Sequence, residues 1–429
     1  MNKVPTPPPG TTLVGARFPL AEYRDPIVPS HKGNPLIEAL APIRTDEEIV
    51  ACLKKLPLFD EKTRVLPGEI RSHCALDLLF LYAPLSNSIE VYKKVCRLIR
   101  LGYRERNPLE PDFWRTFENR VQTPWSSDME DSRSSFCSYI AGMSGGGKTE
   151  TIKQVCRAFP QVIRHENYHG QWLVMVQIVW LRMKCSFDGS QGGFCLNFFR
   201  AVDSLLGTSY QKQYDGSIQD RLQGMKRVCL IHGVGVLVID EIQNLVNAGT
   251  RGEEMLLSFI REMTDLTGVP SILIGTYQAV GVLSKSLATT RRGSSVGDLV
   301  WNPLEHAPGN SSNEWTYFLK SIWKYQFTAR PTPLSRELID VIHHESAGVI
   351  DYAVKLYALS QIRAIELGGD EAITPNLVSS IALDCLNWAR PAIAAIRNRD
   401  TARYIDGLMP ETASLIAQAK AVRRAGDRA

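Results

Sequence analysis

The chain has 429 residues, of which 44% are hydrophobic and 22% charged, and its formal net charge at pH 7 is +4. This composition is ordinary for a soluble protein, the length allows two or three domains, and no apolar run is long enough to span a bilayer. The first ten residues lack the apolar core of a signal peptide, so we expect a cytoplasmic protein with no membrane partner. The mild positive charge neither indicates nor excludes a nucleic-acid partner.

The cysteines give no sign of a disulfide or metal framework. Nine are present, an odd number, and no two of them have the spacing C-x-x-C. Most lie in apolar stretches, where cysteine behaves as a small hydrophobic residue. We therefore expect neither a disulfide framework nor a zinc site.

The N-terminal third of the chain is predicted to be an arm followed by helices. Residues 1–35 are rich in proline and lack periodicity, so they form either an extended arm that docks on another chain or a disordered leader. In residues 36–130, Thr45 and Glu48 occupy the positions of a capping box at a helix start. Helical spacing predicts one helix over 66–83 and another over 88–102. No catalytic constellation is visible in this helical N-terminal region.

A phosphate loop follows at residues 139–149. Gly142, Gly147, Lys148 and Thr149 fit the pattern G-x-x-x-x-G-K-[ST], with a short apolar strand before the loop and a helix after it. The glycines let backbone N–H groups converge on a phosphate, the lysine reaches the β and γ phosphates, and the threonine hydroxyl ligates Mg²⁺. The alternative is a flexible Gly/Ser turn that happens to precede a lysine. The complete predicted cofactor-binding loop is Gly142, Ser144, Gly145, Gly146, Gly147, Lys148, Thr149 and Glu150.

A second anchor lies at the end of the apolar strand predicted over 234–239. This strand ends in Asp240 and Glu241, and a carboxylate at the C-terminal end of a buried parallel strand lies beside the phosphate loop. We predict that Asp240 holds Mg²⁺, together with Thr149. We predict that Glu241 orients and deprotonates the attacking water in phosphoryl transfer.

Other candidate site residues follow along the chain. Residues 161–186 contain a strand signal with a bend or hairpin nearby. The apolar strand over 269–275 leads to Thr276, which is either a sensor of the γ-phosphate or a simple strand-end cap. The basic turn at 288–293 offers Arg291 and Arg292, one of which is either an arginine finger for a neighbouring subunit or part of a solvated surface turn.

The C-terminal part of the chain is predicted to be helical again. Residues 312–390 carry several helix signals, and the His343-His344-Glu345 run lacks the spacing of a metal site. Residues 391–429 are a polar tail or a segment that orders only on a partner. The predicted division is an arm (1–35), a helical N-terminal region (36–130), a nucleotide-binding core (131–305), a helical lid (306–390) and a tail (391–429).

This order of motifs is the layout of an AAA+ ATPase, so the predicted fold is α/β, with a parallel sheet flanked by helices. Within that class the chain resembles the TnsC/TniB family of transposition ATPases over about residues 22–390. The stretches that carry the resemblance begin at Asn34-Pro35, Gly102-Tyr103, Asp240-Glu241, Gly275-Thr276 and Gly348-Val349. The phosphate loop and Asp-Glu pair are specific only to P-loop ATPases, whereas the flanking motifs narrow the family.

The resemblance implies an ATPase that oligomerises with ATP and Mg²⁺ on duplex DNA, as a ring or a helical filament. Such a protein links a target-selection protein to a transposase and does not itself cleave DNA. Many AAA+ lids carry a sensor arginine after the glycine of the lid helix, but here Gly348 is followed by Val, Ile and Asp351. Either Lys355 substitutes for the arginine, or the lid does not touch the nucleotide. For DNA phosphates the predicted contacts are Arg182 and Lys184, which are otherwise solvated charges at a strand end.

Two other readings stay open at this point. One is a signalling or defence P-loop NTPase that acts on protein partners without DNA, and ATPase activity indifferent to DNA would favour it. The other is a phosphotransferase, which needs an acceptor pocket and usually has a small lid. The helical mass after residue 312 argues against the phosphotransferase.

Overall fold

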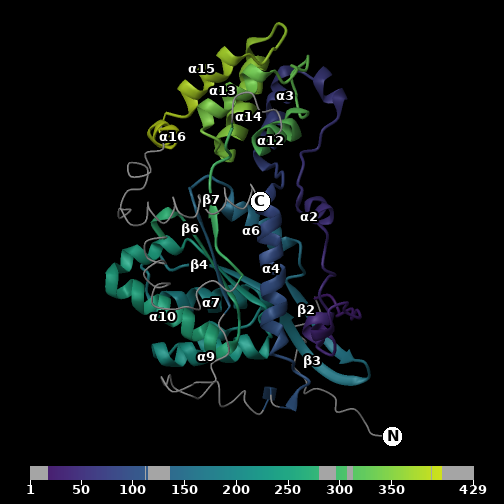
Figure 1. The fold of residues 1–429 in the computed structure, drawn as a ribbon, viewed down its shortest axis with the longest axis vertical. Coiled ribbons are helices and arrows are strands. Elements are labelled where there is room, and N and C mark those ends of the chain that lie inside the picture. The colour runs from purple at the N-terminus through teal and green to yellow at the C-terminus, as the bar shows by residue number, and fades with distance from the viewer. Residues whose placement is uncertain are drawn as a thin grey trace, which may run out of the picture.

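The computed structural model describes residues 18–111, 113–114, 136–279, 296–306, 313–387 and 389–398. It has an α/β core at one end and a bundle of lid helices at the other (Figure 1). Among the described residues, no helix is both long enough and apolar enough to cross a membrane.

The core is built on a five-stranded parallel sheet in the order β4-β5-β6-β1-β7. The strands are β1 (Cys137–Gly142), β4 (Trp180–Lys184), β5 (Val236–Asp240), β6 (Ser271–Gly275) and β7 (Leu299–Trp301). The strand before the phosphate loop, β1, is separated from the Asp-Glu strand, β5, by β6. The sequence-based prediction of an α/β core with a parallel sheet is therefore confirmed, and the structure adds that β6 lies between the two anchor strands.

Helices cover both faces of the sheet, which explains why its strands are apolar throughout. Leu237 and Ile239 of β5 point into one cluster with α7 (Gln191–Leu206), α9 (Ile218–Ile231) and α10 (Gly249–Thr267). Val236 and Val238 point into the other cluster, with α4 (Ser86–Arg104) and α6 (Lys148–Arg157). Both faces are therefore part of the core, and the site must lie at the strand ends.

Several short elements complete the core. The capping box predicted at Thr45 and Glu48 is present, because the Thr45 hydroxyl accepts from Glu48 N and the Glu48 carboxylate accepts from Thr45 N. Besides the helices that cover the sheet, this part of the chain has the short helices η1 (Pro29–His31), α1 (Pro35–Glu38), α2 (Asp46–Leu53), α8 (Tyr210–Gln213) and η4 (Ile242–Ala248).

The strand signal before residue 186 is resolved into a hairpin and one sheet strand. β2 (Val162–Tyr168) and β3 (Gln171–Ile178) pair in antiparallel fashion, and β4 begins directly afterwards. The hairpin turns at His169 and Gly170, whose φ angles of 47° and 89° are both positive. Two positive φ values suit the tight turn that matches the twist of the strands. The predicted hairpin is therefore confirmed.

The lid contains a segment from the N-terminal region. Its own helices are α12 (Glu314–Trp323), α13 (Arg336–Ser346), α14 (Ile350–Leu367), α15 (Pro375–Cys385) and α16 (Arg390–Arg397). Residues 59–85 pack into the same hydrophobic cluster, and Figure 1 shows α3 (Gly68–Ala75) beside α14. The predicted tail at 391–429 starts inside α16.

The prediction of one continuous helix over 66–83 is wrong. The structure has η2 (Glu61–Val65), α3, and then the 3-10 helix η3 (Leu76–Phe80). A 3-10 turn places residues i and i+3 on the same side of the helix. The change at Leu76 therefore lets Ala75 and Leu78, both almost fully buried, enter the lid core together.

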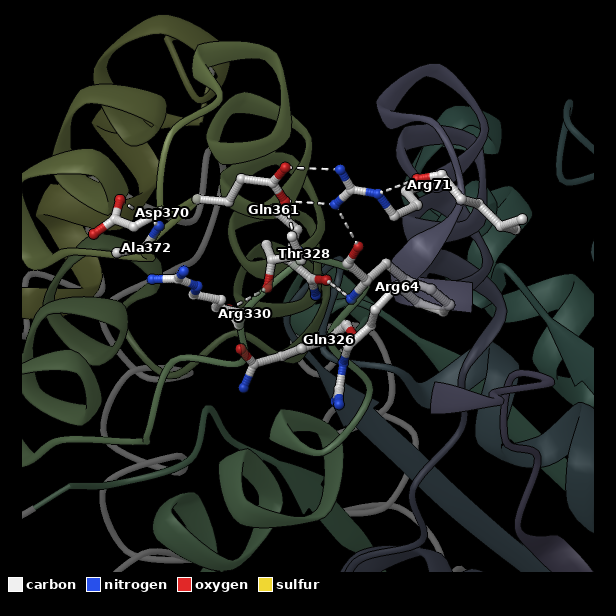
Figure 2. A network of polar contacts seen from close by, with 12 residues as sticks. Arg64, Arg71, Gln326, Thr328, Arg330, Gln361, Asp370 and Ala372 are labelled. Carbon is white, nitrogen blue, oxygen red and sulfur yellow. Dashed lines mark hydrogen bonds and ion pairs between the residues drawn. The ribbon is translucent and has the colours of Figure 1, made fainter. Parts of the chain in front are cut away.

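A buried ion pair fastens this segment to the lid (Figure 2). The two terminal nitrogens of Arg71 lie 2.5 and 2.7 Å from the two carboxylate oxygens of Glu371, and both residues are only 6% exposed. Arg71 also donates to the carbonyls of Leu66 and Phe327, while Glu371 accepts from Ala329 N. The guanidinium nitrogens of Arg71 and the carboxylate oxygens of Glu371 therefore all have hydrogen-bond partners, as a buried ion pair requires.

Candidate nucleotide site

The phosphate loop connects the C-terminal end of β1 to the start of α6. Gly145 and Gly147 have φ angles of 76° and 94°, a region that favours glycine. Gly142 is required for another reason, since a Cβ there would lie 2.3 Å from the carbonyl oxygen of Trp301. The Trp301 indole also donates to Gly146 O at 2.6 Å. The neighbouring strand β7 therefore supports the curled loop from below.

Lys148 is held at the mouth of this loop. Its ammonium donates to Gly142 O at 2.8 Å and to Met143 O at 2.5 Å, and the residue is 8% exposed. Burial lowers the pKa of Lys148 to about 8, and the nearby carboxylates of Asp240 and Glu241 oppose that shift. A buried ammonium next to converging backbone N–H groups is the arrangement that binds phosphate.

The structure brings Thr149 and Asp240 together, as predicted for a magnesium site. The Thr149 hydroxyl lies 3.5 Å from Asp240 Oδ1, and Asp240 is 2% exposed. Asp240 Oδ2 has no hydrogen-bond partner among the described residues, although the Arg182 guanidinium lies 3.8 Å away. Burial raises the pKa of the Asp240 carboxyl, and Glu241 N and Arg182 oppose the shift.

These two oxygen ligands fit Mg²⁺. That ion is usually bound by one or two protein oxygens together with substrate phosphates and waters. Within the described part of the chain, no group of three or more His, Cys, Asp or Glu residues has the arrangement of a separate metal site. Thr149 and Asp240 would therefore hold Mg²⁺ jointly with a bound nucleotide.

Glu241 follows Asp240 in an unusual backbone conformation. Its φ is 60°, in the left-handed region that residues with side chains rarely adopt. Its amide donates to Asp240 Oδ1 at 3.0 Å, and its carboxylate accepts from the side chain of Gln243. Strain of this kind is characteristic of functional sites. Here it turns the Glu241 side chain toward the same cavity as Lys148.

Thr276 lies at the tip of β6, across the cavity from the loop. Its backbone N–H donates to Gln243 Oε1 at 3.1 Å. Its hydroxyl is buried and has no hydrogen-bond partner within the described residues. A buried, unpaired hydroxyl is costly unless it acquires a partner. This geometry is compatible with the predicted sensor and is not required by a strand-end cap.

The site residues surround one cavity of about 230 Å³. Its lining residues are Ser144, Gly145, Gly147, Lys148, Thr149, Glu150, Asp240, Glu241, Gln243, Gly275, Thr276 and Asp351. Both sequence anchors and the sensor candidate are thus gathered in one place. The Glu150 carboxylate accepts from Lys153 at 3.1 Å and from Gln154.

The lid contributes an acidic side chain to this cavity. Asp351, in the first turn of α14, lies beside Gly145 of the phosphate loop. Lys355, the candidate lid sensor, donates to Asp351 Oδ2 at 2.6 Å. The lid side chain that faces the loop is therefore Asp351, and Lys355 is connected to the site through its ion pair with Asp351. Lys355 as a direct phosphate ligand stays a prediction.

The remaining predicted residues lie elsewhere. Arg182 is on β4, where its guanidinium lies 3.8 Å from Asp240 although it does not line the cavity, and Lys184 is exposed at the end of the same strand. Their contact with DNA stays a prediction. Arg291 and Arg292 lie outside the described residues.

Sequence reasoning missed three residues of the site. Trp301 and Asp351 come from β7 and α14, which are distant in sequence from both anchors, so no local pattern marks them. Gln243 does lie within the motif that begins at Asp240. An amide two residues after the Asp-Glu pair was a usable signal.

Comparison with known proteins supports the class of the core. Residues 132–283 match the family model described as AAA domain. No curated protein is significantly similar to this chain.

Three solved structures are similar to this chain at low identity. The Walker-type ATPase PABY2304 of Pyrococcus abyssi is 14% identical, with 67% of this chain and 77% of that chain covered and a TM-score of 0.41. The ORC2 protein of Aeropyrum pernix is 13% identical, with 58% of this chain and 62% of that chain covered and a TM-score of 0.38. The RuvB Holliday junction branch migration motor of Thermotoga maritima is 16% identical, with 67% of this chain and 78% of that chain covered and a TM-score of 0.33. At these scores the likenesses carry no argument about fold or function.

The fold and the site define a P-loop ATPase core of the AAA+ type. The match at residues 132–283 includes β1, the phosphate loop, β5 and β6 with Thr276. All of the core elements that line the cavity fall inside that match.

Proposed function

We propose that this chain is an ATP-dependent AAA+ regulator of DNA transposition. It assembles with ATP on duplex target DNA, as a ring or helical filament, and links a target-selection protein to the transposase. Hydrolysis serves as the switch that ends the assembled state. The observation that carries the ATPase part is the gathering of the phosphate loop, Asp240, Glu241 and Thr276 around one cavity.

Each residue has a distinct task in this proposal. The loop amides and Lys148 hold the phosphates, and the Thr276 hydroxyl acquires its missing partner from the γ-phosphate or its water. Glu241 accepts a proton from the attacking water and orients it. Thr149 and Asp240 would hold Mg²⁺, which neutralises charge on the transferring phosphoryl group.

The transposition part rests on the resemblance, and the packing of the resemblance motifs supports it. Asn34 donates to Tyr103 O at 2.8 Å, and Asn107 donates to Gly33 O at 3.0 Å. Tyr103 in turn donates to Gly233 O at 2.8 Å. The motifs at 34–35 and 102–108 thus meet in one junction, just before the Asp-Glu strand. They therefore act as one structural unit rather than as isolated coincidences.

DNA binding requires positive charge on an accessible surface of the assembly. Lys184 is exposed and is the last residue of β4, the strand that pairs with β5. In the proposal it contacts phosphates without reading bases, and neighbouring copies repeat the contact along the duplex.

Two variants test the ATPase part. Lys148→Ala is expected to abolish nucleotide binding because it removes the buried ammonium. Glu241→Gln is expected to keep binding and to stall turnover in an assembled state. Fluorescent-nucleotide titration and phosphate release measure the two effects. Normal hydrolysis by Glu241→Gln would show that the role given to Glu241 is wrong.

Electron microscopy with duplex DNA tests the assembly. Rings or filaments on DNA that form with a non-hydrolysable ATP analogue but not with ADP would support the proposal. Monomers with both nucleotides, together with ATPase activity unchanged by DNA, would instead favour an NTPase that acts on protein partners.

A further inference from the structure

The short helix η4 places one amide side chain between two residues of the site. Gln243 Nε2 donates to the Glu241 carboxylate, and Gln243 Oε1 accepts from Thr276 N at 3.1 Å. Gln243 is half-buried and lines the same cavity. A single side chain therefore spans the distance from the carboxylate after β5 to the tip of β6.

The orientation of this amide is fixed by chemistry. The Thr276 backbone N–H can only donate, and an ionised Glu241 carboxylate can only accept. The carbonyl of Gln243 must therefore face Thr276, and its NH₂ group must face Glu241. Turning the amide over would place like groups against each other and lose both hydrogen bonds.

The backbone around the amide is shaped to hold it. The left-handed conformation of Glu241 reverses the chain direction directly after β5, so Ile242 and Gln243 point back toward β6. Gly275 leaves the space they occupy, because a Cβ there would lie 2.5 Å from Ile242 Cγ2 and 3.1 Å from Gln243 Oε1. Both features are needed for one amide to reach two strands.

We propose that Gln243 is a positioning residue that couples the state of Thr276 to the placement of the Glu241 carboxylate. This inference rests on the proposed function, in which Glu241 activates water. When the Thr276 hydroxyl binds the γ-phosphate, the tip of β6 becomes fixed. Gln243 is bonded to the backbone N–H of that same residue, so it then fixes the carboxylate as well. Glu241 is set for catalysis only while a triphosphate is present.

The test separates catalysis from binding. Gln243→Ala is expected to lower kcat by about 10- to 100-fold, since misplacing a catalytic group by about 1 Å has effects of this size. The nucleotide Kd and the KM are expected to stay within about twofold, because Gln243 bonds to the backbone N–H of Thr276, which leaves the Thr276 hydroxyl, Lys148 and the loop amides free to hold the phosphates. Asn247→Ala is the matched control, since Asn247 is an exposed amide on the same helix that donates to Phe187 O.

A double-mutant cycle tests the coupling itself. Thr276→Val removes the hydroxyl while keeping the side-chain volume. If Gln243 acts through this residue, adding Gln243→Ala to Thr276→Val lowers kcat little further. Asn247→Ala combined with Thr276→Val is expected to show no coupling.

Gln243→Glu distinguishes the loss of the hydrogen bond to Glu241 from a simple packing defect. It keeps the volume and the acceptor for Thr276 N, but it sets a carboxylate against Glu241, so it too is expected to lower kcat. Wild-type turnover in Gln243→Ala or Gln243→Glu would overturn the inference, as would an equal loss of nucleotide affinity. If Glu241→Gln stalls while Gln243→Ala turns over normally, only the inference fails. If Glu241→Gln hydrolyses normally, the proposed role of Glu241 fails.

Discussion

Nucleotide affinity should weaken as the pH rises through the pKa of Lys148. Burial holds that pKa at about 8, well below the ordinary lysine value of 10.5, because the protein disfavours the charged form. Phosphates restore the charged form, so binding requires a protonated Lys148. Raising the pH therefore weakens nucleotide binding, because it removes the Lys148 proton that the bound phosphates need.

The size of the effect follows from the pKa. With a pKa of about 8, Lys148 is protonated in about nine molecules in ten at pH 7 and in about one in ten at pH 9. The ATP Kd is therefore expected to rise about tenfold over this range, which corresponds to about 1.4 kcal/mol. Nucleotide phosphates titrate near pH 6, so their charge is constant between these two values.

Isothermal titration calorimetry at pH 7, 8 and 9 measures both the Kd and the proton uptake. At pH 8, binding should take up about half a proton, seen as a heat that depends on the ionisation enthalpy of the buffer. Lys148→Arg is the matched control, because a guanidinium stays charged throughout this range. A Kd that does not change between pH 7 and 9 would refute the argument. So would an unchanged pH dependence in Lys148→Arg, because another group would then be titrating.

Two further predictions concern stability and the loop. Glu371→Ala is expected to lower the free energy of unfolding by about 3–5 kcal/mol in urea titrations, because it leaves the buried Arg71 charge without its partner. The matched control is Asp25→Ala, which breaks the exposed ion pair of Asp25 with Lys32 and should cost less than about 1 kcal/mol. Arg71 lowers the pKa of Glu371 below 4.5, so this stabilisation is present above about pH 4.5 and is lost as the pH falls further. Gly142→Ala is expected to destabilise the core by about 1–3 kcal/mol and to weaken nucleotide binding, since its methyl group overlaps the Trp301 carbonyl. Thermal melts and nucleotide titrations check it, and wild-type behaviour in both would contradict the packing argument.

The parts of the molecule that were predictable from sequence are those fixed by local chemistry. The capping box at Thr45 needs only two residues three positions apart, and the hairpin needs only a turn that tolerates positive φ. The position of Asp240 beside the phosphate loop followed from an apolar run that ends in carboxylates, because such a strand is buried on both faces and parallel strands end at the same edge of the sheet. The tip of β6 lies at this edge too, so Thr276 lines the same cavity.

The parts that were not predictable depend on contacts between distant segments. Arg71 and Glu371 are 300 positions apart, and each alone reads as an ordinary surface charge. The helical spacing over 66–83 predicted one helix where the structure has α3 followed by η3, and nothing in it shows that its apolar side packs on the lid rather than on the core. Asp351 was noted only as a departure from an expected arginine. Its place beside Gly145 emerges only from the way α14 docks on the loop.

One segment of the N-terminal region connects the lid to the helix that follows the phosphate loop. Residues 55 and 82 pair where the N-terminal segment leaves the core and returns to it, with backbone hydrogen bonds of 3.0 and 2.7 Å. The Tyr82 hydroxyl donates to Thr151, in the first turns of α6, at 2.8 Å. The far end of the segment is held in the lid by the buried pair of Arg71 and Glu371, which is costly to break. A displacement of the lid is therefore expected to move this segment with it, and the Tyr82 hydrogen bond to Thr151 is where such a displacement would reach the helix that begins at Lys148.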